Sequence, residues 1–416
     1  MPAFIVLLSL LFVWALVSGR LTRWSITAPI LFVVAGMVLT RGANPAVPLD
    51  LEAHSFERAV EIVLAVMLFM DATEGRTYER LGKSVGEGRL LGIALPASAA
   101  LATLLGALVF PGTDWWLLAV AALVVMPVDL APVAGFLRDE RVPLRVRAAL
   151  NIEGGFNDGL VSPLFLFCVA NLATAHGSTF SELLWNVFEG AALAVVVGSL
   201  LGGGAAWLVH HAHESGWARP TALRTASLVL PFLVYATATV VGANGFVAAF
   251  VAGLWYATTA HAVAEDNLGL VHEVGELMAY AVWFTLGKLA ADTFADGVSA
   301  RVVLYGLLAL TVARFVPVVA SLAGTDFPRT ERAAIGWLGA RGVTSIVFAL
   351  LAVIQLPPDD AEFIIGVMCA TVLMSIVLHG VTQEPVARWF ERDARTAPGT
   401  RPTGTWRGPR TRRPGR

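Results

Sequence analysis

The sequence predicts an all-α polytopic membrane protein of about thirteen transmembrane helices. Three observations predict this class. The chain of 416 residues is 56% hydrophobic and only 14% charged, whereas soluble proteins carry about 25% charged residues. Most of its apolar runs reach the roughly 20 residues that a membrane-spanning helix needs. Its arginines concentrate in alternate loops, which is typical of the cytoplasmic side of a membrane protein.

Apolar runs separated by charged residues or by Gly and Pro indicate the helices in order. The first run, residues 2–18, has no basic segment before it and no clear cleavage site after it, so we expect a retained span. The run before Asp71 is short, and two later runs are separated only by residues 241–245. The expected centres are Leu10, Phe32, Ala65, Ala100, Leu123, Leu160, Val195, Leu233, Val251, Ala281, Leu310, Thr344 and Leu373.

Loop charges orient these helices in a cell (inner) membrane, with the N-terminus outside and the C-terminus in the cytoplasm. In this orientation the outer segments hold only three arginines, Arg41, Arg58 and Arg301. The cytoplasmic loops hold Arg20, Arg23, Arg76, Arg80, Lys83, Arg89, Arg138, Arg141, Arg145, Arg147, Arg219, Arg224, Arg329 and Arg332. Residues 391–416 lack an apolar face and are rich in Arg, Pro, Gly and Thr, which predicts a disordered basic cytoplasmic tail. The tail either only fixes the topology or also contacts anionic lipid.

Ionisable side chains inside a span cost roughly 2.5–3.5 kcal/mol each on insertion scales, so they mark candidate sites. The spans of this chain contain several such residues: Glu61, Asp71, Asp129, Glu153, Asp158, Lys288, Arg314 and Arg341. The sequence assigns no role to Arg314, whereas Lys288 lies near the outer end of its span, where its ammonium group can reach water.

Two of these spans are interrupted. Pro127 and Pro132 flank Asp129 and remove backbone donors from the helix. Residues 336–342, which read GWLGARG, interrupt a later span beside Arg341. Broken helices at membrane depth line cavities and form ion sites in many transporters. The alternative interpretation is that both are kinks that serve packing.

Residues 151–159, which read NIEGGFNDG, place two polar faces on one helix. Because residues four apart share a face, Asp158 lies above Gly154, and Asn157 lies above Glu153. We expect open space for an ion or water beside Asp158. Glu153 needs a buried cationic partner, and we expect Arg341 to form this structural ion pair with it.

These segments together resemble the monovalent cation:proton antiporters of the NhaP/NHE type, which include sodium/proton exchangers. The resemblance runs from about residue 59 to residue 390. It rests on the segments LFMDA (68–72), PVD (127–129), NIEGGFNDG (151–159), NGFVAAFVAG (244–253), GARGVTS (339–345) and SIVLHG (375–380).

The resemblance implies a transmembrane antiporter domain at residues 1–390 with inverted repeats, two broken crossing helices and elevator-type alternating access. It implies a mobile core, residues 89–173 and 299–388, and a dimerisation scaffold, residues 3–75 and 183–291. It further implies a homodimer and a role in pH homeostasis.

By the same resemblance, Asp158 and Asp129 bind the cation and the proton, and Asp71 adds a third carboxylate. Asn157 before Asp158 goes with electroneutral exchange. Val128 stands where the family often has Thr, so it offers only a backbone carbonyl, and Gly154 stands where the family often has Ser.

The expected activity is exchange of Na⁺, or of Li⁺ or K⁺, for H⁺ across the lipid bilayer, without a cofactor, catalytic residue or nucleic acid. Competing classes are a membrane-embedded enzyme and a transport-inactive sensor. No Ser/His pair or metal-ligand set is visible in the spans, and His379 alone favours a packing role. The loop histidines His210, His211 and His213 either sense pH or are simply solvated.

Overall fold

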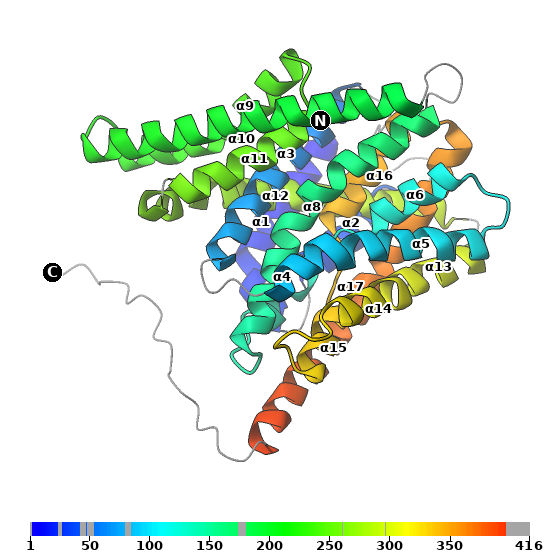
Figure 1. The fold of residues 1–416 in the computed structure, drawn as a ribbon. Coiled ribbons are helices and arrows are strands. Elements are labelled where there is room, and N and C mark those ends of the chain that lie inside the picture. Colours follow the sequence, from blue (N-terminus) through cyan, green and yellow to red (C-terminus); the bar gives the residue numbers. More distant parts are fainter. Residues whose placement is uncertain are drawn as a thin grey trace.

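The computed structural model describes residues 2–23, 27–41, 47, 54–79, 85–173, 180–259, 261–295 and 297–396. Throughout this described part the chain forms helices and connecting loops without a strand (Figure 1). In chain order the helices are α1 (Pro2–Arg23), α2 (Ala28–Leu39), α3 (His54–Glu79), α4 (Val85–Arg89), the π-helical turn η1 (Leu90–Ala94), α5 (Leu95–Val109), α6 (Trp115–Val125), the 3₁₀ turn η2 (Ala131–Val133), α7 (Ala134–Leu137), α8 (Leu144–Ala173), α9 (Phe180–Glu214), α10 (Pro220–Val240), α11 (Gly245–Thr259), α12 (His261–Thr293), α13 (Ala300–Leu310), α14 (Val312–Ser321), α15 (Arg329–Trp337), α16 (Val343–Gln355) and α17 (Pro358–Thr396).

A helix lies at each of the thirteen expected centres. Among the described residues, six helical stretches are long and apolar enough to cross a membrane, and five shorter helices are also apolar. The all-helical membrane class is therefore confirmed, whereas the count of thirteen crossings stays a prediction.

The surface differs from that of a soluble protein, and the mainly apolar interior contains a few charged side chains. Large apolar side chains face outward, with exposed fractions of 85% for Val240 and 78% for Leu108. A few charged side chains lie inside: Glu153, Arg314 and Arg341 are each exposed by 3% or less. Such an arrangement is favourable where lipid surrounds the helices and charges pair within the bundle.

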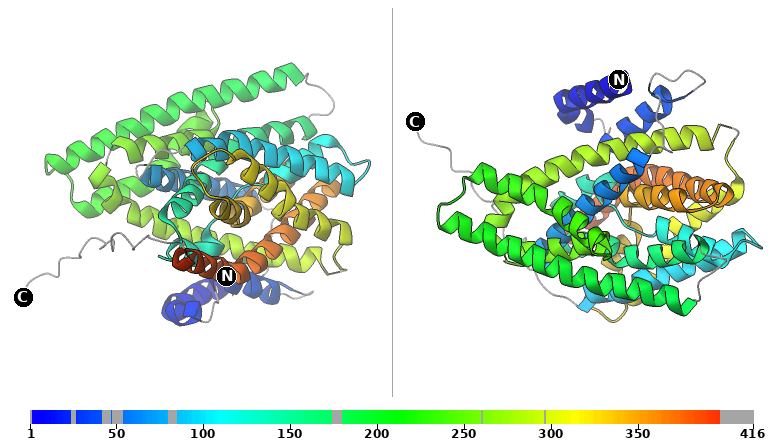
Figure 2. Two further views of the ribbon diagram at one scale, coloured as in Figure 1. Left: turned by 60° about the horizontal axis from the view of Figure 1, so that its bottom comes forward. Right: turned by 90° about the horizontal axis from the view of Figure 1, so that it is seen from above.

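The helices pack in two neighbourhoods that meet at α3 and α8. Helix α11 packs between α9 and α3, and α3 also packs against α8. On the other side α5 packs against α6 and α14, while α13 packs against α17. Figure 2 shows the long green helix α9 along one edge of the molecule, away from the orange helix α17. The division into a mobile core and a dimerisation scaffold stays a prediction.

Both expected helix interruptions are confirmed. Helix α6 ends at Val125, and the chain is unwound over residues 126–130 before η2 begins. Helix α15 ends at Trp337, and residues 338–342 are unwound before α16 begins. Pro127 and Pro132 lack the backbone N–H that would continue the first helix. The alternative that these are packing kinks within continuous helices does not apply, because both segments are unwound.

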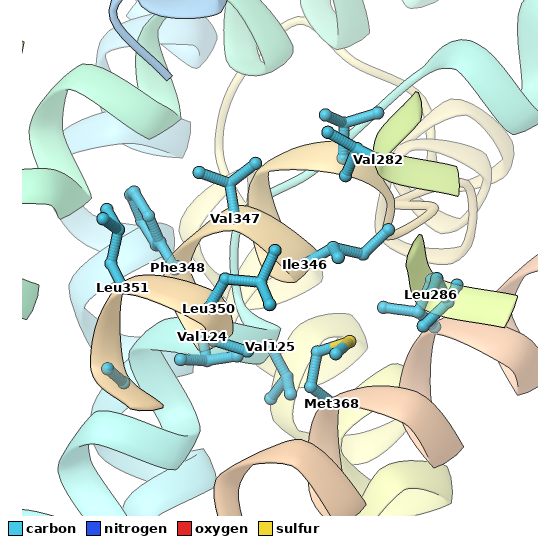
Figure 3. Close-up of a cluster of buried hydrophobic side chains, with 14 of the residues drawn as sticks. Val124, Val125, Val282, Leu286, Ile346, Val347, Phe348, Leu350, Leu351 and Met368 are labelled. Atoms are coloured by element: carbon cyan, nitrogen blue, oxygen red, sulfur yellow. The ribbon is translucent and has the colours of Figure 1, made fainter. Parts of the chain in front are cut away.

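The second broken helix is anchored by apolar packing of α16 (Figure 3). All its side chains from Val343 to Ala352 are buried. Phe348 stacks on Phe165 of α8 with ring centroids 4.7 Å apart. In Figure 3, Ile346 and Leu350 face a cluster that includes Val125 of α6 and Met368 of α17. This close packing holds α16 in place, including its first turn beside the unwound segments.

The predicted boundary of the tail is wrong by a few residues. Helix α17 continues through Thr396, so residues 391–396 are helical rather than part of the tail. Glu391 and Arg392 extend a helix that already contains Arg388 paired with Glu384 one turn earlier, an arrangement that favours helical structure. Residues 397–416 lie outside the described residues.

Candidate functional site

The two unwound segments cross and bond to each other. The backbone N–H of Asp129, in the first segment, donates to the carbonyl of Ala340 in the second, at 2.8 Å. One backbone donor and one backbone acceptor released at the breaks are thereby satisfied by the opposite segment. Buried backbone groups need such partners, and membrane depth offers no water to replace them.

Asp129 caps two helix beginnings at once. Its Oδ1 accepts the Ala131 N–H at 2.8 Å, at the start of η2. Its Oδ2 accepts the Val343 N–H at 2.7 Å, at the start of α16. A carboxylate at a helix beginning satisfies free N–H groups and complements the positive end of the helix dipole. This close approach requires Gly342, because a Cβ atom there would lie 2.1 Å from Asp129 Oδ2.

Arg341 binds the C-terminal end of α6 at the same crossing. Its Nη1 donates to the carbonyl of Met126, and also to the carbonyl of Pro127 at 3.2 Å. The side chain is completely buried. A cation at the end of α6 complements the negative pole of that helix dipole. Asp129 and Arg341 therefore place opposite charges on opposite helix ends within one crossing.

The predicted ion pair between Glu153 and Arg341 is wrong. Glu153 instead pairs with Arg314 of α14, whose Nη1 and Nη2 donate to Oε1 at 2.6 Å and Oε2 at 2.8 Å. The Arg314 Nη2 also donates to the carbonyl of Ile335 at 3.2 Å, near the end of α15. Gly339 makes room for this guanidinium, because a Cβ atom there would lie 1.7 Å from its Nε. The bidentate geometry suits a buried arginine–carboxylate pair.

Asp158 lies on α8 beside the beginning of α16 and is only 3% exposed. Its Oδ2 accepts the hydroxyl of Thr344, in the first turn of α16. Its Oδ1 accepts no hydrogen bond from a described donor. The carboxyl group of Asp71, on α3, interacts directly with that of Asp158. The buried Asp158 and the half-buried Asp71 therefore bring carboxyl groups from two helices together.

Asn157 ties α8 to the first unwound segment. Its Nδ2 donates to the carbonyl of Val128 at 3.1 Å. The Val128 carbonyl oxygen is the backbone ligand predicted from the sequence. The bond from Asn157 uses one of its lone pairs, and the second lone pair remains available. The Oδ1 of Asn157 and the Oγ of Ser345 have no hydrogen-bond partner among the described residues, although both side chains are fully buried.

The expected open space beside Gly154 is wrong. Leu130 of the first unwound segment packs over this glycine, and a Cβ atom at Gly154 would lie 3.0 Å from Leu130 Cδ1. Helical spacing correctly placed Gly154 on the Asp158 face. It did not show that the unwound chain sends an apolar side chain there.

Two residues of the site had no assigned role in the sequence. Thr344 binds Asp158 directly, and Ser345 adds a buried hydroxyl. The sequence does contain a pattern that could have identified them: two consecutive hydroxyl residues stand in the first turn of an otherwise apolar helix, directly after a break. Hydroxyl, carboxylate, amide and carbonyl oxygens together are the donor set that small hard cations prefer.

Other polar residues lie away from this crossing. Lys288 donates to Asp292 at 2.7 Å, one turn along α12. His210, His211 and His213 are exposed near the end of α9, where His211 stacks on Trp207. Within the described part of the chain, no group of three His, Cys, Asp or Glu side chains is arranged to hold a metal ion.

Comparisons with known proteins agree with this architecture. The family model of the transmembrane sodium/hydrogen exchanger matches residues 6–389. Over 313 residues the chain is 26% identical to the K⁺/H⁺ antiporter NhaP of Alkalimonas amylolytica, covering 72% of this chain and 53% of that protein. Over 278 residues it is 22% identical to a Na⁺/H⁺ antiporter of Schizosaccharomyces pombe, covering 60% of this chain and 59% of that protein. The chain thus spans little more than half the length of these curated relatives.

A solved structure shows the same fold. The sodium proton antiporter MjNhaP1 from Methanocaldococcus jannaschii, determined at pH 8, superposes with a TM-score of 0.73 at 20% sequence identity. The superposition covers 91% of this chain and 98% of that protein.

Proposed function

The chain belongs to the sodium/hydrogen exchanger family, and from this premise we propose that it is a secondary antiporter exchanging a monovalent cation for a proton. The observation that carries the proposal is Asp158: a buried carboxylate with one oxygen bound to Thr344 and the other without a described hydrogen-bond donor. A charge in this location is costly unless it binds a proton or a cation. Either ligand neutralises it, so the two compete.

Competition for one carboxylate explains coupled exchange. The site crosses the membrane cheaply only when it is neutral, which means with a proton or with a monovalent cation bound. Asn157, which precedes Asp158, carries no charge, so the proposed stoichiometry is one cation for one proton. Asp71 and the spare lone pairs of Asp129 are accessory ligands in this scheme, and Asp129 also maintains the crossing.

The proposed movement is an elevator-type displacement of residues 89–173 and 299–388 against a dimerising scaffold, residues 3–75 and 183–291. The contact of α3 with α8 supports this assignment, because it brings Asp71 of the scaffold to Asp158 of the core. The proposed location is the cell (inner) membrane, the assembly is a homodimer in the bilayer, and the role is pH homeostasis. No resident cofactor takes part.

Na⁺ is the proposed cation, with Li⁺ and K⁺ as further substrates. K⁺/H⁺ exchange is the second candidate, supported by the naming of the Alkalimonas relative as a K⁺/H⁺ antiporter. A transport-inactive sensor is the remaining alternative, and Asp129, Asp158 and Thr344 argue against it because all three are in place at the crossing.

Proteoliposomes with an internal pH-sensitive dye test the proposal. An outward proton gradient should dissipate after addition of Na⁺, and comparison with Li⁺ and K⁺ gives the selectivity. At one fixed K⁺ concentration, the Na⁺-dependent rate should be equal with and without valinomycin, which clamps the membrane potential, if exchange is electroneutral. Absence of a response to every cation from folded protein would favour the sensor.

A further inference from the structure

Two buried side chains of α17 hold the second unwound segment at its two ends. The Oγ of Ser375 accepts the backbone N–H of Arg341 at 2.7 Å. The Nε2 of His379 lies 2.8 Å from the carbonyl of Trp337, the last residue of α15. Ser375 is completely buried and His379 is 1% exposed, so water does not compete for these bonds.

The partners of the two ring nitrogens favour one placement of the hydrogens in this network, because Nδ1 has a hydroxyl partner and Nε2 has only a carbonyl. A carbonyl can only accept, so His379 Nε2 carries a hydrogen and donates it to Trp337. In a neutral imidazole the other nitrogen then has none. Nδ1 therefore accepts the hydroxyl of Ser375, which lies 3.0 Å away. The Ser375 oxygen remains free to accept from Arg341, and every hydrogen of the network has an acceptor.

Burial of the His379 ring favours this neutral form, and nearby charges add to the effect. Nδ1 also lies 2.9 Å from the backbone carbonyl of Ser375. With a hydrogen already on Nε2, donation from Nδ1 to this carbonyl would require an imidazolium. The charged groups that face the ring are the guanidinium groups of Arg341 and Arg314. A third positive charge beside these two is unfavourable, so the chain of bonds runs from Arg341 through Ser375 and His379 to Trp337.

The segment that α17 holds is the one that bonds to the first broken helix. The carbonyl of Ala340 accepts the N–H of Asp129. The guanidinium of Arg341 donates to the carbonyl of Met126. A shift of residues 338–342 would therefore displace the partners of Asp129 and of the end of α6 together.

We propose that Ser375 and His379 are positioning residues for the cation site. They hold residues 338–342 from α17, and this segment in turn sets the crossing at which Asp129 and Thr344 face Asp158. The link to the cation rests on the proposed antiport function, whereas the hydrogen-bond network itself can be tested without transport.

Hydrogen exchange of the purified protein tests the network directly. In Ser375→Ala the Arg341 amide loses its acceptor, and in His379→Leu the Trp337 carbonyl loses its donor. We expect exchange of residues 338–342 to accelerate about tenfold in both, the effect of one lost buried hydrogen bond. His379→Gln, whose amide can still donate to Trp337, should stay near the native rate.

Thr371→Val is the matched control. Thr371 is a fully buried hydroxyl residue one turn before Ser375, but its Oγ1 donates within α17, to the carbonyl of Val367. It should leave exchange of residues 338–342 unchanged. Native exchange in Ser375→Ala, or equal acceleration in Thr371→Val, would overturn the proposal.

Two further measurements complete the test. In proteoliposomes Ser375→Ala should raise the apparent KM for the cation about tenfold with little change in maximal rate, whereas loss of rate alone would contradict positioning. Ring nitrogen shifts of ¹⁵N-histidine-labelled native protein, assigned by their loss in His379→Gln, should show a neutral ring with hydrogen on Nε2. Hydrogen on Nδ1 alone would overturn the network even if Ser375→Ala and His379→Leu do not fold.

Discussion

The two buried arginines of the crossing have different partners and different consequences. Arg314 neutralises Glu153 through two hydrogen bonds. Arg341 forms no ion pair within the described residues and donates instead to carbonyl oxygens at the end of α6. Arg314 compensates the full negative charge of a carboxylate, whereas Arg341 compensates only the partial charge of a helix end. Removing the two side chains should therefore lower the stability of the protein by different amounts.

Arg314→Ala should destabilise the protein strongly, because it leaves the Glu153 carboxylate buried without a cation. Breaking a buried pair in this way typically costs about 3–5 kcal/mol. Melting temperature and folded yield in detergent measure the effect, and Arg301→Ala, at an exposed position of α13, is the control. A melting temperature equal to that of the control would contradict the structural role of the pair.

Thr344→Val should weaken cation binding without unfolding the protein. Valine keeps the shape of threonine but removes the hydroxyl that donates to Asp158. We expect an apparent KM for the cation that is at least about tenfold higher, since hydrogen bonds to charged groups contribute about 1.5–3 kcal/mol. Thr344→Ser retains the hydroxyl and should transport normally. Equal kinetics for the two variants would contradict a role of the Thr344 hydroxyl in cation binding.

The sequence identified most of the site residues but not all of their partners. Spacing along α8 correctly separated the Glu153 face from the Asp158 face, because that inference concerns one helix. The partner of Glu153 comes from a distant helix, and two buried arginines were available. Only the packing of α14 against α15, with Gly339 leaving room for the guanidinium, decides in favour of Arg314.

At the scale of elements, each helix end at the crossing has a dedicated partner. Asp129 serves the beginnings of η2 and α16. Arg341 binds a backbone carbonyl at the end of α6, and Arg314 and His379 bind backbone carbonyls at the end of α15. Helix ends leave backbone groups unsatisfied, so side chains replace the missing turns and keep two broken helices stable at membrane depth.

Gly342→Ala should disrupt the crossing. The added Cβ atom would lie 2.1 Å from Asp129 Oδ2 and would separate that carboxylate from the start of α16. We expect a lower melting temperature and loss of cation-dependent exchange. Gly380→Ala on α17, where an added Cβ meets nothing within 4 Å, should behave as the native protein. Native transport by Gly342→Ala would show that this cap is dispensable.

Prolines and glycines in apolar runs predicted where the helices break, because these residues act locally on the backbone. They did not predict the path of the unwound chain. Leu130 packs over Gly154 as a consequence of that path, and no helical periodicity applies to an unwound segment. The space for an ion therefore could not be located from spacing alone.

At the scale of the whole molecule, the arginine asymmetry predicts the orientation in the membrane. The N-terminus should lie outside and the C-terminus in the cytoplasm. Reporter fusions after Arg138 and after the C-terminus should both report the cytoplasmic side, and a fusion after Arg301 the outer side. A tail found outside would require one crossing more or fewer than predicted.

The central claim is that one carboxylate, Asp158, carries either the cation or the proton. Asp158→Asn keeps the size of the side chain but removes both charge and titration. The most direct measurement is cation-dependent proton flux in proteoliposomes containing this variant, with Asp359→Asn, at an exposed position of α17, as the control. We expect a folded Asp158→Asn protein with no exchange for Na⁺, Li⁺ or K⁺, and a fully active control. Near-native exchange by folded Asp158→Asn protein would contradict this claim.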